Sequence, residues 1–100
     1  MTLAEFQHSL AAKTAPRGLA SPLVALWWAQ KGDWDKAHKI VMDDNGRDAA
    51  WVHAYLHRLE GDADNATYWY RQARRPVAIG PHDAEWAAIA VALLGEAARE

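Results

Sequence analysis

The stretch from residue 51 to 73, WVHAYLHRLEGDADNATYWYRQA, most constrains what this chain can fold into, because it has the pattern of two helices joined by a sharp corner. In its first half, apolar residues recur every three to four positions, which places them on one broad helical face: Trp51, Val52, Tyr55, Leu56 and Leu59. A helix over residues 51–60 is therefore predicted, with an aromatic and aliphatic side that packs inward.

The corner itself is predicted from two adjacent residues. Gly61 ends the first pattern, as a residue that tolerates positive φ does just after a helix. Asp62 follows as an N-cap, because its carboxylate can accept from the free amides of the next helix. That second helix carries an apolar face and stops before Pro76. The residues of this face are Ala66, Trp69, Tyr70 and Ala73.

A second copy of the corner lies upstream, where Gly32-Asp33-Trp34 precedes Ala37 and Val41. The two glycines are 29 positions apart (61 − 32). Glycine, aspartate and a following small alanine in this order resemble the corner of the tetratricopeptide repeat, whose usual period is about 34 residues. The resemblance covers residues 21–76. It implies antiparallel helix pairs stacked in a right-handed superhelix, with the first helix of each pair lining a concave surface.

The string HAYLHRLEGD, followed by NA and then YWY, is also similar to one in small bacterial and fungal helical proteins of unassigned function. That resemblance implies a fold and no activity. In the tetratricopeptide-like arrangement, the helix over residues 51–60 would turn its polar side toward the concave groove. Ligands of such folds lie in that groove, so the resemblance implies a binding surface there.

Other patterns predict the remaining helices. Thr2 caps a helix over residues 2–12, and Ser21 caps the next one, which Pro22 opens at its first position. Asp33 caps a helix over residues 34–43, and Pro81 begins the last one. The main face of that last helix consists of Trp86, Ile89, Leu93 and Ala97. We expect an all-α fold of about six helices in antiparallel pairs, in a single domain spanning residues 1–100.

Composition excludes several classes of function. A net charge of −2 gives no basic face for nucleic acid. The longest apolar run, residues 86–94, is far shorter than the roughly 20 residues of a membrane-spanning helix. The absence of cysteine excludes disulfides and thiol chemistry. Because the first residues also lack a basic secretory signal, we expect a cytoplasmic protein that binds neither nucleic acid nor membrane.

The most suggestive chemistry is a polar side of the helix over residues 51–60. His53, His57 and Glu60 follow one another at i, i+4 and i+7, opposite the apolar face. Two imidazoles at this spacing can share a divalent metal, with the carboxylate as a third ligand and His8, His38 or His82 as a further donor. The same three groups can instead transfer protons. A third interpretation is structural, with both imidazoles solvated or hydrogen-bonded to Glu60 and a neighbouring helix.

Two further side chains are binding candidates. Tyr68 points away from the apolar face of its helix, toward a partner or the concave surface. Arg58, together with the arginines at 71, 74 and 75, can bind an acidic peptide or a phosphate, or simply complement a helix C-terminus. The zinc-protease motif HExxH is excluded, because Ala54 follows His53.

These features favour a non-catalytic interaction module that binds a protein partner or a second copy of itself. The apolar last helix motivates this hypothesis, because it is either well covered or half of a homodimer interface. The alternative is a small metal-dependent or His/Glu-dependent enzyme that uses His53, His57 and Glu60. A small-ligand-binding protein with its aromatic residues beside the groove is a third option. The interaction-module hypothesis expects no cofactor, and the enzyme alternative can use a divalent metal.

Overall fold

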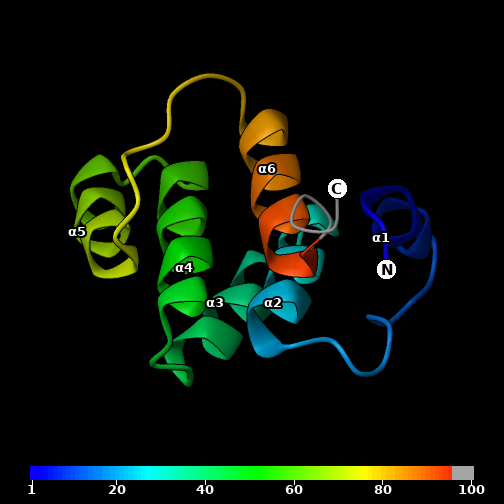
Figure 1. Ribbon diagram of the computed structural model, residues 1–100. Helices are drawn as coiled ribbons and strands as arrows, with labels where there is room; N and C mark the ends of the chain where they lie inside the picture. Colours follow the sequence, from blue (N-terminus) through cyan, green and yellow to red (C-terminus); the bar gives the residue numbers. More distant parts are fainter. Residues whose placement is uncertain (96–100) are drawn as a thin grey trace.

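The computed structural model describes residues 1–95, and within that range the chain is all-helical, as predicted (Figure 1). Ala97, expected on the face of the last helix, lies outside the described residues. None of the helices within residues 1–95 has the length and apolarity needed to cross a membrane. The helices are α1 (Leu3–Ser9), α2 (Ser21–Gln30), α3 (Trp34–Met42), α4 (Arg47–Leu59), α5 (Ala63–Ala73) and α6 (His82–Leu94).

The two Gly-Asp corners have the same geometry, and each joins a pair of antiparallel helices. Gly32 and Gly61 take φ angles of 88° and 85°, which side chains other than glycine rarely adopt. The carboxylate of Asp33 accepts from the Lys36 amide at 3.1 Å. The carboxylate of Asp62 accepts from the Asn65 amide at 3.2 Å. Both N-caps are therefore confirmed, and they start α3 and α5 in the same way.

Helix α6 packs across α2 and α4 and also contacts α1, so it does not continue the stack beyond α5 (Figure 1). Its anchor is Trp86, whose indole Nε1 donates to the carbonyl of Leu26 at 2.9 Å. The Trp86 ring also stacks on Phe6 of α1, with centroids 5.4 Å apart. A single buried side chain thereby links α1, α2 and α6.

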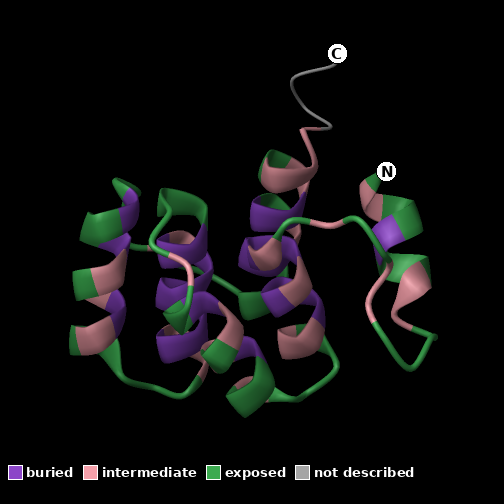
Figure 2. Cartoon of the chain, turned by 90° about the horizontal axis from the view of Figure 1, so that it is seen from below, coloured by how far each residue is buried: buried purple, intermediate pink, exposed green. Residues whose placement is uncertain are grey.

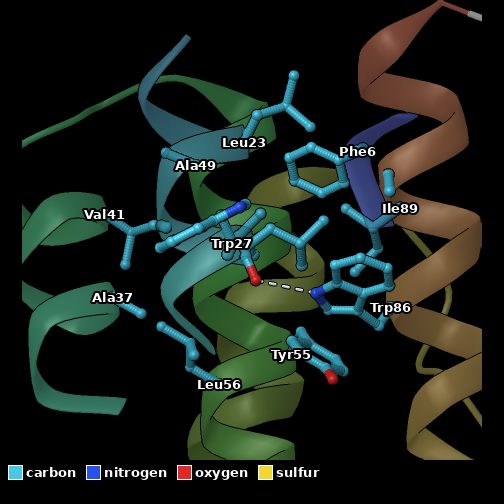
Figure 3. Packing of buried hydrophobic residues seen from close by; sticks show 14 residues of the cluster. Phe6, Leu23, Trp27, Ala37, Val41, Ala49, Tyr55, Leu56, Trp86 and Ile89 are labelled. Atoms are coloured by element: carbon cyan, nitrogen blue, oxygen red, sulfur yellow. Dashed lines mark hydrogen bonds between the residues drawn. The ribbon is translucent and has the colours of Figure 1, made fainter. Parts of the chain in front are cut away.

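The main hydrophobic core lies where α1, α2, α4 and α6 meet (Figure 3). Figure 2 shows the buried residues gathered on the inner faces of these helices. Helix α4 contributes the apolar residues that its pattern predicts to lie inward, Val52, Tyr55 and Leu56. A smaller cluster of Ala54, Ala66 and Tyr70 joins α4 to α5, where the two small alanines let the helices approach closely.

Two local predictions need correction. Ser21 is not a cap: Ala20 is the N-cap of α2, and the Ser21 hydroxyl donates to the Asp44 carboxylate. Ser21 is the first residue of the helix itself, so its hydroxyl is free to donate to this carboxylate from the turn after α3. Helix α1 ends at Ser9, because the following amides turn back to carbonyls three residues earlier. The two alternatives for the last helix both remain: α1, α2 and α4 cover most of α6, and Ala84, Ala88 and Ala92 stay exposed on its remaining side.

Candidate metal centre

His53 and His57 are buried, with relative exposures of 4% and 5%. The core residues of α4 occupy the side that faces α2 and α6. Helices α3 and α5 instead close over the opposite side of α4, where both imidazoles lie. The polar side of α4 therefore lies between α3 and α5, where both imidazoles border a cavity.

His38 of α3 joins the two imidazoles of α4 in a compact cluster. Its ring centroid lies 4.8 Å from that of His53 and 5.2 Å from that of His57. The centroids of His53 and His57 are 4.9 Å apart, so the three rings form a nearly equilateral triangle. The Nε2 atoms of His38 and His53 are 3.0 Å apart and share a hydrogen bond. One ring nitrogen from each histidine lies within 4.8 Å of the other two.

Two tryptophans hold the imidazole planes. Trp34 stacks on His38 at 4.6 Å between centroids and meets His57 edge-on at 5.8 Å. The Trp34 indole is itself fixed, because its Nε1 donates to the carbonyl of Leu56 at 2.7 Å. Trp69 of α5 stacks on His53 at 3.9 Å, with the two planes 13° apart. These flat contacts restrict rotation of the imidazoles and leave their nitrogens facing one another.

Glu60 orients the third histidine from behind. Its carboxylate lies 2.7 Å from Nδ1 of His57. Because an ionised carboxylate can only accept a hydrogen bond, Nδ1 carries the proton in this pair. The neutral imidazole then has a free lone pair on Nε2. This contact is the hydrogen bond between His57 and Glu60 that the structural interpretation of the sequence expects.

The surroundings favour the neutral forms of His53 and His38. Burial lowers the pKa of His53 from 6.5 to about 4, and the positive charge that His38 and His57 would carry lowers it further. Burial also lowers the pKa of His38, with His57 as the second cause. A neutral imidazole is the form that binds a metal, so at pH 7 these groups need not first lose a proton.

The three imidazoles line one cavity of about 650 Å³ between α3, α4, α5 and the turn that joins α3 to α4. Trp34 and Glu60 do not line it, so they support the cluster from the other side. The lining combines aromatic, amide and charged side chains. Its residues are His38, Val41, Met42, Asp44, Asn45, Gly46, Arg47, Ala50, His53, His57, Asn65, Tyr68, Trp69 and Gln72.

Of the other two candidates, Tyr68 lies in this cavity and Arg58 does not. Tyr68 is 53% exposed, beside Trp69. Arg58 pairs with the buried carboxylate of Glu85 at 2.9 Å and also donates to the carbonyl of Gly80. The Tyr70 hydroxyl donates to the same carboxylate, which ties α4 and α5 to α6. Burial, followed by this hydrogen bond, raises the pKa of Tyr70.

A second group in the described residues, His57, Glu60 and Asp62, also brings three ligand atoms together. Its two carboxylates are exposed, and that of Asp62 already accepts from the first turn of α5. A metal there would have to share the carboxylate that caps α5. In the cluster of three imidazoles, a metal would replace the hydrogen bond between His38 and His53. We prefer this cluster because His53 and His57 are buried.

No protein-family model, curated protein or solved structure matches this chain. The likeness to the tetratricopeptide repeat therefore depends on the residues of the two corners. What the cluster does has to be inferred from its own geometry.

Proposed function

We propose that this protein binds one divalent transition-metal ion, zinc above all, through His38, His53 and His57. The convergence of three imidazoles on one cavity carries the proposal. Zinc–nitrogen bonds of 2.0–2.1 Å in a tetrahedron separate ligand nitrogens by about 3.3 Å. The Nε2 atoms of His38 and His53 are already 3.0 Å apart, and every nitrogen of the set lies within 4.8 Å of the others. Side-chain shifts of about an ångström are enough to close the site.

The donor set also selects the metal. Imidazole nitrogens suit zinc, copper, nickel and cobalt, whereas magnesium and calcium prefer oxygen ligands. The contact from Glu60 to Nδ1 of His57 is the arrangement in which a carboxylate fixes the tautomer and raises the basicity of a ligating histidine. Three protein ligands leave a fourth position, which faces the cavity because all three rings line it.

An open fourth position connects this proposal to the enzyme alternative. A metal held by three histidines can polarise a bound molecule or lower the pKa of a bound water. A metal-free acid–base enzyme receives less support. The lowered pKa of His53 keeps that ring out of the imidazolium form at pH 7, so it is poorly suited to act as a general acid.

The test is a titration with cobalt(II), whose visible absorption reports coordination, and with zinc(II) by calorimetry. We expect one ion per chain, and at least a hundredfold weaker binding after His38→Gln, His53→Gln or His57→Gln. His82→Gln on exposed α6 and His8→Gln on α1 are the matched controls and should leave binding unchanged. Circular dichroism checks that each variant is folded. Equal binding by the wild type and all three cluster variants would contradict the proposal.

The interaction-module hypothesis uses a different surface. Val77 and Ile79, in the segment between α5 and α6, are 52% and 92% exposed. Apolar side chains this exposed can contact a partner chain. Sedimentation of the wild type and of Ile79→Ser tests self-association: the hypothesis expects a concentration-dependent dimer that the substitution weakens. A monomer at all concentrations would remove the support for a homodimer.

A further inference from the structure

We infer that the cavity beside the histidine cluster binds a small aromatic carboxylate, with the carboxylate on the metal and the flat ring against Tyr68 and Trp69. This inference rests on the proposed metal site. It adds the chemical class of the molecule that fills the fourth position.

The charges of the lining favour an anion. Asp44 and Arg47 are the two charged side chains that line the cavity apart from the histidines. The Asp44 carboxylate already accepts from the Ser21 hydroxyl and from the amide of Gly46, and these hydrogen bonds lower its pKa. Arg47 has no hydrogen-bond or ion-pair partner within residues 1–95. Once a divalent cation sits on neutral imidazoles, positive charge exceeds negative charge in the cavity, and a carboxylate is the complementary group.

The wall contributed by α5 favours a flat apolar body. Tyr68 and Trp69 meet at 89° with centroids 5.0 Å apart, which forms an aromatic corner. One face of Trp69 is taken by His53, whereas the ring of Tyr68 remains half exposed. Val41 and Met42 of α3 add apolar surface to the same cavity. An aromatic ring placed here makes offset or edge contacts of the kind that aromatic pairs prefer.

The same wall carries amide groups that can set the orientation of the bound molecule. Asn65, Tyr68 and Gln72 follow one another at i, i+3 and i+7, so they form a stripe along the cavity side of α5. The side-chain amides of Asn65 and Gln72 have no hydrogen-bond partner within the described part of the chain. Each offers both a donor and an acceptor. A cavity of about 650 Å³ also falls within the range of small-molecule sites.

The experiment uses cobalt(II)-loaded protein and three probes: benzoate, benzamide and acetate. Benzamide keeps the ring without the charge, and acetate keeps the charge without the ring. We expect benzoate to change the cobalt absorption and to bind at least tenfold more tightly than acetate, and benzamide to leave the cobalt spectrum unchanged. Tyr68→Ala should lower the affinity for benzoate until it is about equal to the affinity for acetate. The affinity for acetate itself should not change. Arg47→Gln should weaken both anions, and the remote exposed Arg17→Gln should weaken neither.

The outcomes separate this inference from the metal proposal. A normal cobalt spectrum that benzoate does not alter overturns the inference and leaves the metal site standing. Equal affinity for benzoate and acetate, in wild type and Tyr68→Ala alike, also overturns it, because the aromatic wall then contributes nothing. A chain that binds no cobalt overturns both proposals.

Discussion

On one side of α4, Val52, Tyr55 and Leu56 pack into a core shared with α1, α2 and α6. On the other side, His53 and His57 are buried just as deeply but border a cavity between α3 and α5. The first side is filled with apolar side chains, and the second keeps space beside stacked imidazoles. Burial alone therefore does not distinguish the two sides of α4; the kind of group that is buried and the space beside it do.

The tryptophans divide in the same way. Trp27 and Trp86 are buried in the core, where Trp86 stacks on Phe6 and donates to a backbone carbonyl. Trp34 and Trp69 are partly buried and stack on His38 and His53. The first pair fills volume between helices. The second pair fixes ring planes next to the cavity.

The largest expected effect tests this division directly. Trp86→Ala should lower the free energy of unfolding by about 3–5 kcal/mol, because it empties a large space in the core and removes a hydrogen bond. Trp69→Ala should cost clearly less, because its ring is partly exposed, yet it should weaken metal binding at least tenfold. Urea unfolding of the two variants measures the loss in the free energy of unfolding, and zinc titration measures the loss in metal affinity. Equal stability losses, or metal binding unaffected by Trp69→Ala, would erase the distinction between the two sides.

Acidification should destabilise the cavity side. The pKa of His53 is about 4 in the folded protein and near 6.5 when unfolded, so between these values the unfolded chain binds more protons. The contribution of His53 to the free energy of unfolding is fully present above pH 6.5. It is lost as the pH falls toward 4, and the loss is as much as about 3 kcal/mol. Urea unfolding at a series of pH values, without added metal, measures this slope. His53→Gln should flatten it, and an unchanged slope in that variant would show that other groups cause it.

Glu60→Gln should show whether Glu60 orients the His57 ring or binds the metal directly. The amide is nearly the same size, but it can donate to Nδ1 and so favours the wrong tautomer of His57. Zinc affinity should fall about 10- to 100-fold, as expected for a group behind a ligand, with stoichiometry still one per chain. Calorimetry measures both quantities. Complete loss of binding would instead make Glu60 a direct ligand, and no change would remove its orienting role.

The smallest effect compares the two corners. Asp33→Ala and Asp62→Ala should each cost about 1 kcal/mol, because each removes the same N-cap contact. Thermal or urea unfolding of both variants measures these losses in the free energy of unfolding. A much larger loss at Asp62 would mean that this residue has a further role, such as metal binding in the group with His57 and Glu60.

The corners and the apolar faces were predictable because their signals are local. Glycine at a helix end and aspartate at the next N-cap act through neighbouring backbone groups, and both appear in the structure as expected. Ser21 shows the limit of this reasoning. Its hydroxyl is used by Asp44, a residue 23 positions away, and no local pattern contains that contact.

The site was predicted in part. His53 and His57 were singled out by their spacing on one helix, and His38 was one of three possible donors. Which of the three approaches depends on how α3 packs against α4, a tertiary contact that helix periodicity does not determine. The one local signal is that His38 lies four residues after Trp34, a spacing that allows the two rings to stack on one face of α3. Glu60 was assigned as a ligand because sequence spacing does not reveal which nitrogen of His57 it meets.

The most direct test of the metal centre is a long-range ¹H–¹⁵N spectrum of the five histidine side chains, with and without one equivalent of zinc. The ring nitrogens of His38, His53 and His57 should shift to values typical of zinc ligands, while those of His8 and His82 stay in place. Before zinc is added, His57 should already show the tautomer with its proton on Nδ1. Unchanged spectra of all five histidines, or a shift confined to His57, would contradict the three-histidine metal centre.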